Sequence, residues 1–548
     1  MKLSKFDIGA EIISILTKGM YQDPRDALRE YIQNAVDANS ENIDVKIRQN
    51  FIIVEDDGTG MDYKVLRKAV RIGVSDKKPG KDVGFMGIGI YSAYHLCDKL
   101  IIYSKTKDSL PHKLEMNFSK MKEVLSEQKD LRLKNELSGD EFIDLQTLLE
   151  KYIFLSDENT LDLTEYPKKG TRVELIGVEP HFYKELTNFD FVANYLKDVV
   201  PLHFNFEEFE WGKEIEDKIT KICEEYDAKF ELVNVKLQVN NKVENLYKPY
   251  KDSDFHNNKS QKPVFKELKT SKNFIGVVWG CLNSTRNKIR DKNLRGFLIR
   301  KQGFAIGRRE NVVKYFNSHT HFDRFIGEII VVNPNLLPNA SRDDFEFTKL
   351  RSRFYDLLAQ VGSEYNQLSN DFQNETKAKE RISEISQRLK IINAHFSEYE
   401  KNVEKLVDFL IELKNFNNEL ESIKNRKVLK DERELIILQK SLTDIIQSIQ
   451  LTINNLVAEK KNNKKKSSKT NKVQIAKKLN EIKSSEEIKR YENVLEVLKD
   501  LDFEFEEEVN KIFSIIDELF IQRLAENKKM YYELLDELKR ELLNIEDL

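Results

Sequence analysis

The chain has few cysteines and no long hydrophobic run. Its three cysteines, Cys97, Cys223 and Cys281, stand far apart, and none belongs to a C-x-x-C pair. This spacing argues against a disulfide framework and a zinc cluster, so three buried thiols are expected. The first apolar stretch carries Asp7 and Glu11, which argues against a signal peptide. Because no stretch approaches the roughly 20 apolar residues of a membrane span, we expect a cytoplasmic protein without membrane contact.

The chain also lacks an excess of charge of either sign. It carries 90 Lys and Arg residues against 93 Asp and Glu residues, a formal net charge of −3. This balance argues against a protein that coats nucleic acid over its whole surface, although it leaves local basic patches open. With 548 residues, of which 40% are hydrophobic, the chain is long enough for two to four domains.

Glycine and proline are absent after Gly362. Hydrophobic residues then recur at 3-4 spacing in two runs, separated by the charged stretch "KNRKVLKDER". The spacing predicts a coiled coil or a long helical hairpin over 361–458. The two runs either pair within one chain or bind another chain, and spacing alone does not decide. The residues of the two runs are Ile382, Ile385, Leu389, Ile392, Phe396, Tyr399, Val403, Leu406, Leu410 and Leu413, then Leu435, Leu438, Leu442, Ile445 and Ile449.

The end of the chain changes composition again. Residues 459–480 hold nine lysines and one acidic residue, a low-complexity pattern typical of a linker. The lysines at 460–478 are either a solvated spacer or a contact for nucleic acid or another polyanion. Residues 481–548 are expected to form a final helical, acidic segment.

Residues 1–180 alternate helical and strand-like patterns. "DPRDALREYIQNAVDA" predicts a helix with Asp23 as N-cap and Pro24 at the first helical position. "NIDVKIRQNFIIVEDDGTGM" predicts two strands that end in a glycine loop. The acidic stretch 107–165 is poorly patterned and is expected to be an insertion, and 170–178 is expected to be the strand that closes the domain. Residues 181–360 again mix strands and helices, which suggests a second α/β domain.

The helix "LREYIQNAVDA" carries polar residues on one face. Glu30, Asn34 and Asp37 lie at i, i+4 and i+7, so they share that face. Such a face beside an apolar stripe is either solvated surface or part of a site. About 20 residues later, "EDDGTGM" contains the D-x-G-x-G pattern Asp56, Gly58 and Gly60. A carboxylate at a strand end can accept a hydrogen bond from an exocyclic amine such as that of adenine, and glycines let the backbone approach a flat ring.

A second glycine pattern, "GFMGIG", contains Gly84, Gly87 and Gly89 before a predicted helix, whose free N–H groups suit phosphate. It does not match a P-loop, because Gly80 and Lys81 are followed by an aspartate. The dinucleotide and kinase loops have the reverse glycine order. A Gly-Thr pair at 170–171 completes the series, and four motifs in this order are a far stronger signal than any one of them.

These motifs resemble those of the GHKL ATPases, a superfamily that includes gyrase B, ninety-kilodalton heat-shock chaperones, histidine kinases, MutL-type repair proteins and MORC proteins. "LREYIQNAVDA", "GFMGIGIYSAYHLCDKL" and "ILTKGMYQDP" are most similar to the heat-shock chaperone. The resemblance implies an α+β fold: a Bergerat-fold ATPase sandwich over 1–180, then an α/β transducer, or middle, domain over 181–360. It stops near residue 350, so the helical coiled-coil C-terminal region stands where the chaperone has its dimerisation domain.

The resemblance implies a role for each motif residue, with ATP and Mg²⁺ as cofactors. Glu30 would be the general base that activates the attacking water, and Asn34 would be a Mg²⁺ ligand. Asp37 would support the same region or the ribose. Asp56 would bind adenine, helped by Thr171. The other residues expected to bind the cofactor are Gly58, Gly60, Met61, Ser75, Lys77, Gly84, Gly87, Ile88 and Gly89.

The segment 73–84, "GVSDKKPGKDVG", would be the ATP lid, with glycines at both ends and lysines that either meet phosphate or keep the loop soluble. Ser75 and Lys77 resemble the MutL and MORC lids more than the chaperone's longer lid. In the second domain, "NPNLLPNASRDDFE" is similar to a chaperone loop, and this match makes Arg342 the arginine that reaches the ATP γ-phosphate.

Two functions are compatible with the resemblance. The first is a slow ATPase of the heat-shock-chaperone type, a homodimeric clamp that acts on a protein client or partner effector, as in bacterial defence against phage. The second is a MORC- or MutL-like clamp associated with DNA, which the short lid, the coiled coil and the lysines at 460–478 favour. A histidine kinase is not expected, because His95 and His395 lack any supporting motif.

Overall fold

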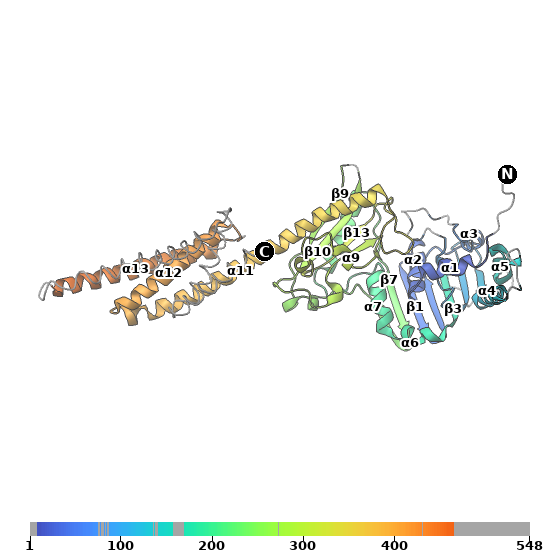
Figure 1. Ribbon diagram of the computed structural model, residues 1–548, viewed down its shortest axis with the longest axis horizontal. Coiled ribbons are helices and arrows are strands. Elements are labelled where there is room, and N and C mark those ends of the chain that lie inside the picture. Colours follow the sequence, from blue (N-terminus) through green and yellow to red (C-terminus); the bar gives the residue numbers. More distant parts are fainter. Residues whose placement is uncertain are drawn as a thin grey trace, which may run out of the picture. The chain divides into compact units, whose positions relative to one another are not determined.

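The computed structural model describes residues 8–464, except 75–76, 78–81, 83, 85–86, 135, 137–140, 157–168, 272 and 430. The described chain forms two compact units. The first comprises 8–381 with 427–429, and the second comprises 382–426 with 431–464. All of the described strands, and helices α1 to α10, belong to the first unit (Figure 1). Ser75 and residues 465–548, which include most of the lysine-rich segment and all of 481–548, lie outside the described residues.

An eight-stranded sheet forms the first domain. Its order is β5–β4–β3–β6–β2–β1–β7–β8, with every neighbouring pair antiparallel except β1 and β7. The strands are β1 (Asn42–Arg48), β2 (Phe51–Asp56), β3 (Cys97–Lys105), β4 (His112–Asn117), β5 (Ile153–Ser156), β6 (Gly170–Val178), β7 (Asn234–Val239) and β8 (Lys242–Leu246).

The strand predicted over 170–178 is confirmed as β6. In the sheet it lies in the middle, paired with β2 on one side and β3 on the other. That 107–165 is an insertion stays a prediction; its described residues supply strands β4 and β5 together with helices α4 (Phe118–Leu133) and α5 (Leu145–Tyr152). Sequence patterns report local structure, whereas strand order depends on pairing between distant segments.

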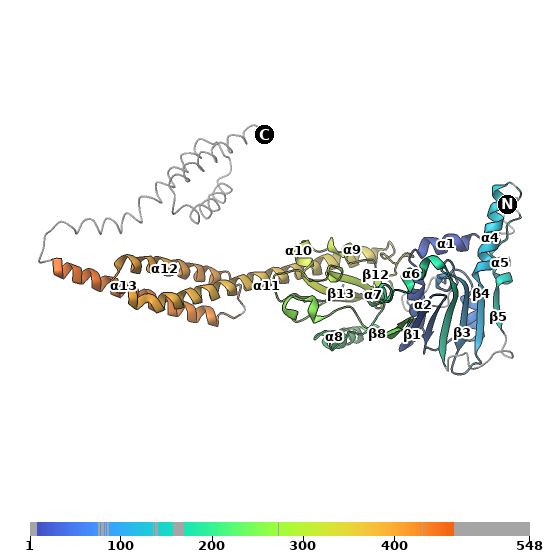
Figure 2. The same cartoon turned by 90° about the horizontal axis from the view of Figure 1, so that it is seen from below.

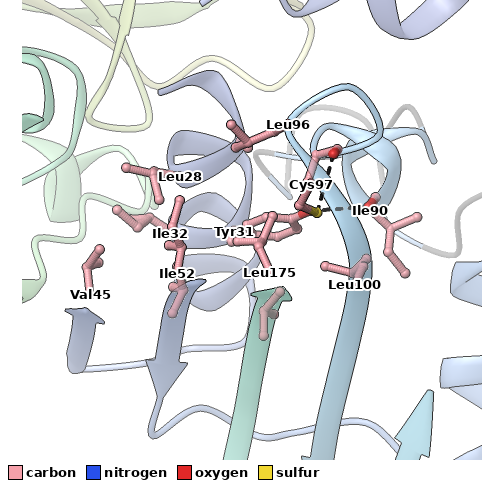
Figure 3. Close-up of a cluster of buried hydrophobic side chains, with 14 of the residues drawn as sticks. Leu28, Tyr31, Ile32, Val45, Ile52, Ile90, Leu96, Cys97, Leu100 and Leu175 are labelled. Atoms are coloured by element: carbon pink, nitrogen blue, oxygen red, sulfur yellow. Dashed lines mark hydrogen bonds between the residues drawn. The ribbon is translucent and has the colours of Figure 1, made fainter. Parts of the chain in front are cut away.

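Helix α2 (Asp26–Asp37) packs its apolar face on the sheet. Leu28 and Ile32 are fully buried and lie over Val45 of β1 and Ile52 of β2 (Figure 3). The alternating burial of β1 and β2 fits a sheet with one face against this helix. The predicted cap is wrong, because the helix begins at Asp26 with Arg25 in the N-cap position.

The Asp23 carboxylate instead accepts hydrogen bonds from the backbone N–H and the guanidinium of Arg25.

The other helices of the first domain are α1 (Ile12–Met20), α3 (Tyr63–Ala69), α6 (Tyr183–Leu186) and α7 (Phe189–Val199). All three cysteines are buried and unpaired, as expected from their spacing.

A five-stranded sheet, in the order β12–β11–β13–β10–β9, forms the second domain. Helix α8 (Gly212–Glu225) packs on the side of Trp279, and the first half of α11 (Lys349–His395) packs on the side of Phe297. Two covered faces explain the continuous apolar runs of its central strands. Its remaining elements are β9 (Val264–Lys269), β10 (Phe274–Leu282), β11 (Gly296–Lys301), β12 (Phe304–Ile306), β13 (Phe325–Val331), α9 (Glu310–Val313) and α10 (His319–Phe322).

The first sheet continues past residue 180, where the sequence predicts a domain boundary. β7 pairs in parallel with β1, and the first hydrophobic core includes residues from α7, β7 and β8 as far as Leu246. A parallel neighbour requires a long crossover connection, and here the crossover from β6 contains α7 and α8. We therefore propose that 181–246 is shared between the two domains.

A buried cluster of charged residues joins the two domains. The carboxylate of Glu328, on β13, accepts hydrogen bonds from Lys248, Tyr250 and Arg300. Lys248 follows β8 of the first sheet, and Arg300 also donates to the carbonyl of Val200 at the end of α7. The charged side chains are at most 1% exposed. Burial opposes ionisation of Glu328, but Arg300 and Lys248 outweigh it and lower the pKa of its carboxyl group to about 2.

The second unit is helical, as expected. It contains the end of α11, helix α12 (Val403–Asn425) and helix α13 (Arg433–Lys464), with α12 and α13 packed together (Figure 2). The first apolar run does not form one helix, because the chain turns at the 3₁₀ segment Phe396–Tyr399. The charged break falls between α12 and α13. No helix among the described residues is long and apolar enough to cross a membrane.

Candidate functional site

A cavity of about 300 Å³ lies beside the polar face of α2. The sheet contributes Asp56 and Thr171, and a loop of the second domain contributes Arg342. Twelve of the predicted site residues line it: Glu30, Asn34, Asp37, Asp56, Gly60, Met61, Lys77, Gly84, Gly87, Gly89, Thr171 and Arg342. Gly58 and Ile88 do not line it. The structure therefore brings together residues from motifs that span more than 300 positions of the sequence.

The end of the cavity nearest the sheet is built around Asp56. Its Oδ1 accepts hydrogen bonds from the Gly58 backbone N–H at 2.8 Å and from Ser40 Oγ at 3.0 Å. Burial raises the pKa of the Asp56 carboxyl group, and these hydrogen bonds oppose the increase. Thr171 pairs with Asp56 across β2 and β6, and its hydroxyl lies 2.9 Å from that of Ser104. The arrangement holds a carboxylate and a hydroxyl network at one end of a partly apolar cavity.

The second glycine of D-x-G-x-G is needed for close backbone packing. Gly60 has a φ of 71°, and a Cβ there would lie 2.1 Å from the carbonyl oxygen of Lys105. A larger residue would therefore push the strand β3 away and change the shape of the cavity.

The polar face of α2 holds a lysine of the predicted lid. Lys77 Nζ donates to Asn34 Oδ1 at 2.8 Å and to Asp37 Oδ2 at 2.7 Å. The backbone N–H of Gly84 donates to the same Asp37 oxygen at 2.9 Å. Asn34 and Asp37 thus already hold one cation between them.

Glu30 and Arg342 meet at the same cavity. Arg342 Nε lies 3.2 Å from Glu30 Oε1, with side chains 10% and 9% exposed. The loop holds Arg342 at a φ of 55°, with its N–H donating to the carbonyl of Asn339 and its own carbonyl accepting from Gly307. Tyr21 lies beside the pair: burial, and then the charge of Glu30, raise the pKa of its hydroxyl.

The glycine loop packs tightly against this pair, but it does not open a long helix. A Cβ at Gly89 would lie 2.7 Å from Glu30 Oε2, so glycine is needed there for the carboxylate to keep its place. The predicted helix is wrong: only the 3₁₀ turn Gly89–Tyr91 follows, and β3 begins at Cys97. The carbonyl of Ile90 accepts a hydrogen bond from the Tyr31 hydroxyl. Phosphate would therefore meet loop N–H groups rather than the dipole of a long helix.

The site fits a Mg²⁺ ion that is shared with phosphate. Among the described residues, no group of three or more His, Cys, Asp or Glu side chains forms a metal site on its own. Mg²⁺ usually takes one or two protein oxygens and completes its shell with water and substrate phosphates. Asn34 Oδ1 and Asp37 Oδ2, which converge on the Lys77 ammonium, are oxygens of the required kind.

Three contributors to the site were missed from the sequence. Ser40 and Ser104 support the Asp56 end, and no pattern in the sequence marks either one. Tyr21 also lines the cavity. It belongs to "ILTKGMYQDP", a stretch that resembles the chaperone, but the resemblance does not mark Tyr21 itself as a site residue.

A family comparison covers the first part of the site. Residues 21–141 match the family described as histidine kinase-, DNA gyrase B-, and HSP90-like ATPase. The match includes Glu30, Asp56 and the glycine loop, but neither Thr171 nor Arg342. A comparison with curated proteins gave no match. The segment 21–141 is therefore similar to the ATPase domains of the GHKL superfamily, and this similarity supports binding and hydrolysis of ATP.

Proposed function

We propose that the protein is a slow ATPase that works as a conformational switch, with ATP and Mg²⁺ bound in the cavity beside α2. The observation that carries the proposal is the 3.2 Å contact between Glu30 and Arg342. A carboxylate that can take a proton from water and a guanidinium that can stabilise phosphate charge converge there from two domains.

In this proposal each part of the cavity has one task. Asp56 and the neighbouring hydroxyls receive the adenine amine at the sheet end. Glu30 orients a water and accepts its proton, and Arg342 stabilises the charge that develops on the γ-phosphate. Asn34, with Asp37 beside it, would hold Mg²⁺, which supplies charge neutralisation on the phosphates. The loop N–H groups near Gly87 contact the phosphate oxygens.

The switch itself rests on the arrangement of the two domains. Because Arg342 belongs to the second domain and Glu30 to the first, the state of the nucleotide biases how these domains contact each other. We propose that this movement drives a homodimeric clamp of the heat-shock-chaperone type, which acts on a protein client or partner effector. A bacterial anti-phage system is one setting that suits such a clamp.

Replacing Arg342 with alanine tests the observation behind the proposal. Loss of a hydrogen bond to a charged group costs about 1.5–3 kcal/mol, so turnover should fall roughly 10- to 100-fold. Affinity for a non-hydrolysable ATP analogue should change much less, because most of the cavity is intact. Phosphate release and calorimetric titration measure the two effects. Arg353→Ala, on the exposed side of α11, is the matched control. Wild-type turnover in Arg342→Ala would show that the arginine has no role in hydrolysis.

A DNA-associated clamp of the MORC or MutL kind is the second candidate, and the nine lysines of 459–480 favour it. If it is correct, the full chain should retard duplex DNA on a gel at low salt. The shift should weaken steeply as salt increases and disappear when 460–478 is deleted. If the deletion variant still retards DNA, the DNA contact lies outside 460–478. If the full chain does not retard DNA even at low salt, this candidate is excluded.

A further inference from the structure

Lys77 occupies the position at which the cavity offers oxygens to a cation. Its ammonium donates to both Asn34 Oδ1 and Asp37 Oδ2, at 2.8 and 2.7 Å. The Asp37 side chain is only 3% exposed, whereas that of Lys77 is 32% exposed. Burial of a carboxylate is costly unless it is paired, and the Lys77 ammonium offsets part of that cost for Asp37.

The ammonium and a divalent ion cannot use these oxygens together. An ion bound to Asn34 Oδ1 and Asp37 Oδ2 would lie within a few ångströms of the ammonium, and two cations that close repel each other strongly where solvent is partly excluded. We propose that Lys77 is a built-in competitor of Mg²⁺: it holds Asn34 and Asp37 in the nucleotide-free protein and must leave before the metal can enter with ATP. This role rests on the proposed function, because Lys77 would regulate the same ATP and Mg²⁺ site.

A buried amide lies next to the oxygens that hold Lys77. Gln33, which precedes Asn34 on α2, is fully buried, and within the described structure neither its Oε1 nor its Nε2 has a hydrogen-bond partner. A Cβ on Gly84 would lie 2.7 Å from Gln33 Nε2, so the glycine that donates to Asp37 also covers this amide. Unpaired buried amide groups destabilise the arrangement that buries them.

Displacement of Lys77 has a consequence for the nucleotide. Once a metal takes the oxygens of Asn34 and Asp37, the ammonium is released at the edge of the cavity that it lines. It is then available to a phosphate oxygen, which carries the opposite charge. The same lysine thus excludes divalent ions without nucleotide and favours the ion together with phosphate.

Mn²⁺ binding to the nucleotide-free full chain tests the competition without relying on activity. Free Mn²⁺ is measured by electron paramagnetic resonance during titration. Lys77→Met, which shortens the side chain by only one atom and removes its charge, should bind Mn²⁺ at least tenfold more tightly than wild type. Lys77→Arg keeps the charge and should behave as wild type. Lys64→Met, at an exposed position of α3, is the control and should show no gain.

The double variant Lys77→Met/Asn34→Ala identifies the oxygens involved. The tenfold gain, which corresponds to about 1.4 kcal/mol, should disappear when Asn34 is removed. Equal Mn²⁺ affinity of Lys77→Met and wild type, or a gain that survives Asn34→Ala, would overturn the proposal. A separate calorimetric titration measures whether the wild type binds an ATP analogue. Its absence would refute the nucleotide function and leave the cation competition intact.

Discussion

Replacing Glu30 with glutamine is expected to lower ATP turnover about 10²- to 10⁴-fold, the usual contribution of a positioned general base. Glutamine keeps the size of the side chain and an oxygen for Arg342, but it cannot accept a proton from water. The affinity for nucleotide should change little, because other elements build the proposed adenine end of the cavity around Asp56. Loss of turnover with retained binding is the signature of a group that acts in the transition state.

The measurement pairs phosphate release with calorimetric titration of a non-hydrolysable ATP analogue. Glu41→Gln is the matched control, because Glu41 is exposed just before β1 and does not line the cavity. Turnover of Glu30→Gln within twofold of wild type would rule out Glu30 as the base. Lost binding in the variant would instead indicate a structural role for the carboxylate.

The parts of the site that sequence predicts best are those fixed by local geometry. Helical spacing alone places Glu30, Asn34 and Asp37 on one face, and all three line the cavity. The paired strands β1 and β2 also follow from alternation and a short turn. Only the resemblance to the chaperone loop predicts Arg342 at the site, since nothing local connects it with α2.

The parts that sequence could not predict depend on contacts between distant segments. The pairing of Lys77 with Asn34 and Asp37 joins residues about 40 positions apart, and no local pattern encodes it. The central position of β6 and the parallel pairing of β7 with β1 likewise depend on sheet order. The sequence also predicts a helix after the glycine loop, where the structure has the 3₁₀ turn Gly89–Tyr91 and then β3 from Cys97.

The sequence does contain one indication of the buried charges between the domains. Arg300 and Lys301 stand side by side in the strand pattern "FLIRKQGF", and successive residues of a strand point to opposite faces. In a sheet covered on both sides, both charges must be buried, and each therefore needs a partner. Arg300 donates to Glu328, and Lys301 donates to the carbonyl of Asn333.

Replacing Glu328 with glutamine is expected to destabilise the joint between the two domains by about 3–5 kcal/mol, the typical cost of removing one partner of a buried ion pair. The change leaves Lys248 and Arg300 buried without their shared carboxylate. Arg309 is linked to the same carboxylate through two hydrogen bonds, by way of the Tyr250 hydroxyl. Since Lys248 already has a pKa lowered to about 8, chiefly by burial, it can relieve part of the cost by losing its proton.

Thermal unfolding followed by circular dichroism measures the effect. A loss of this size should lower the midpoint by roughly 5–15 °C. Glu244→Gln is the matched control: Glu244, on β8, pairs with Lys197 of α7 at 2.7 Å, but its side chain is 40% exposed. Exposed pairs contribute about 0–1 kcal/mol, so this variant should shift the midpoint little.

Comparing the two variants shows whether burial of the ion pair, rather than the mere loss of one carboxylate, determines the loss of stability. Both remove one carboxylate that pairs with a lysine, and they differ mainly in burial, which is nearly complete for Glu328 and partial for Glu244. If the midpoint falls equally in both, the buried cluster contributes no more than a surface pair and does not fix the domains. If only Glu328→Gln is destabilised, the cluster is the rigid link against which Arg342 is held near Glu30. Its loss should then also reduce ATP turnover below the melting range.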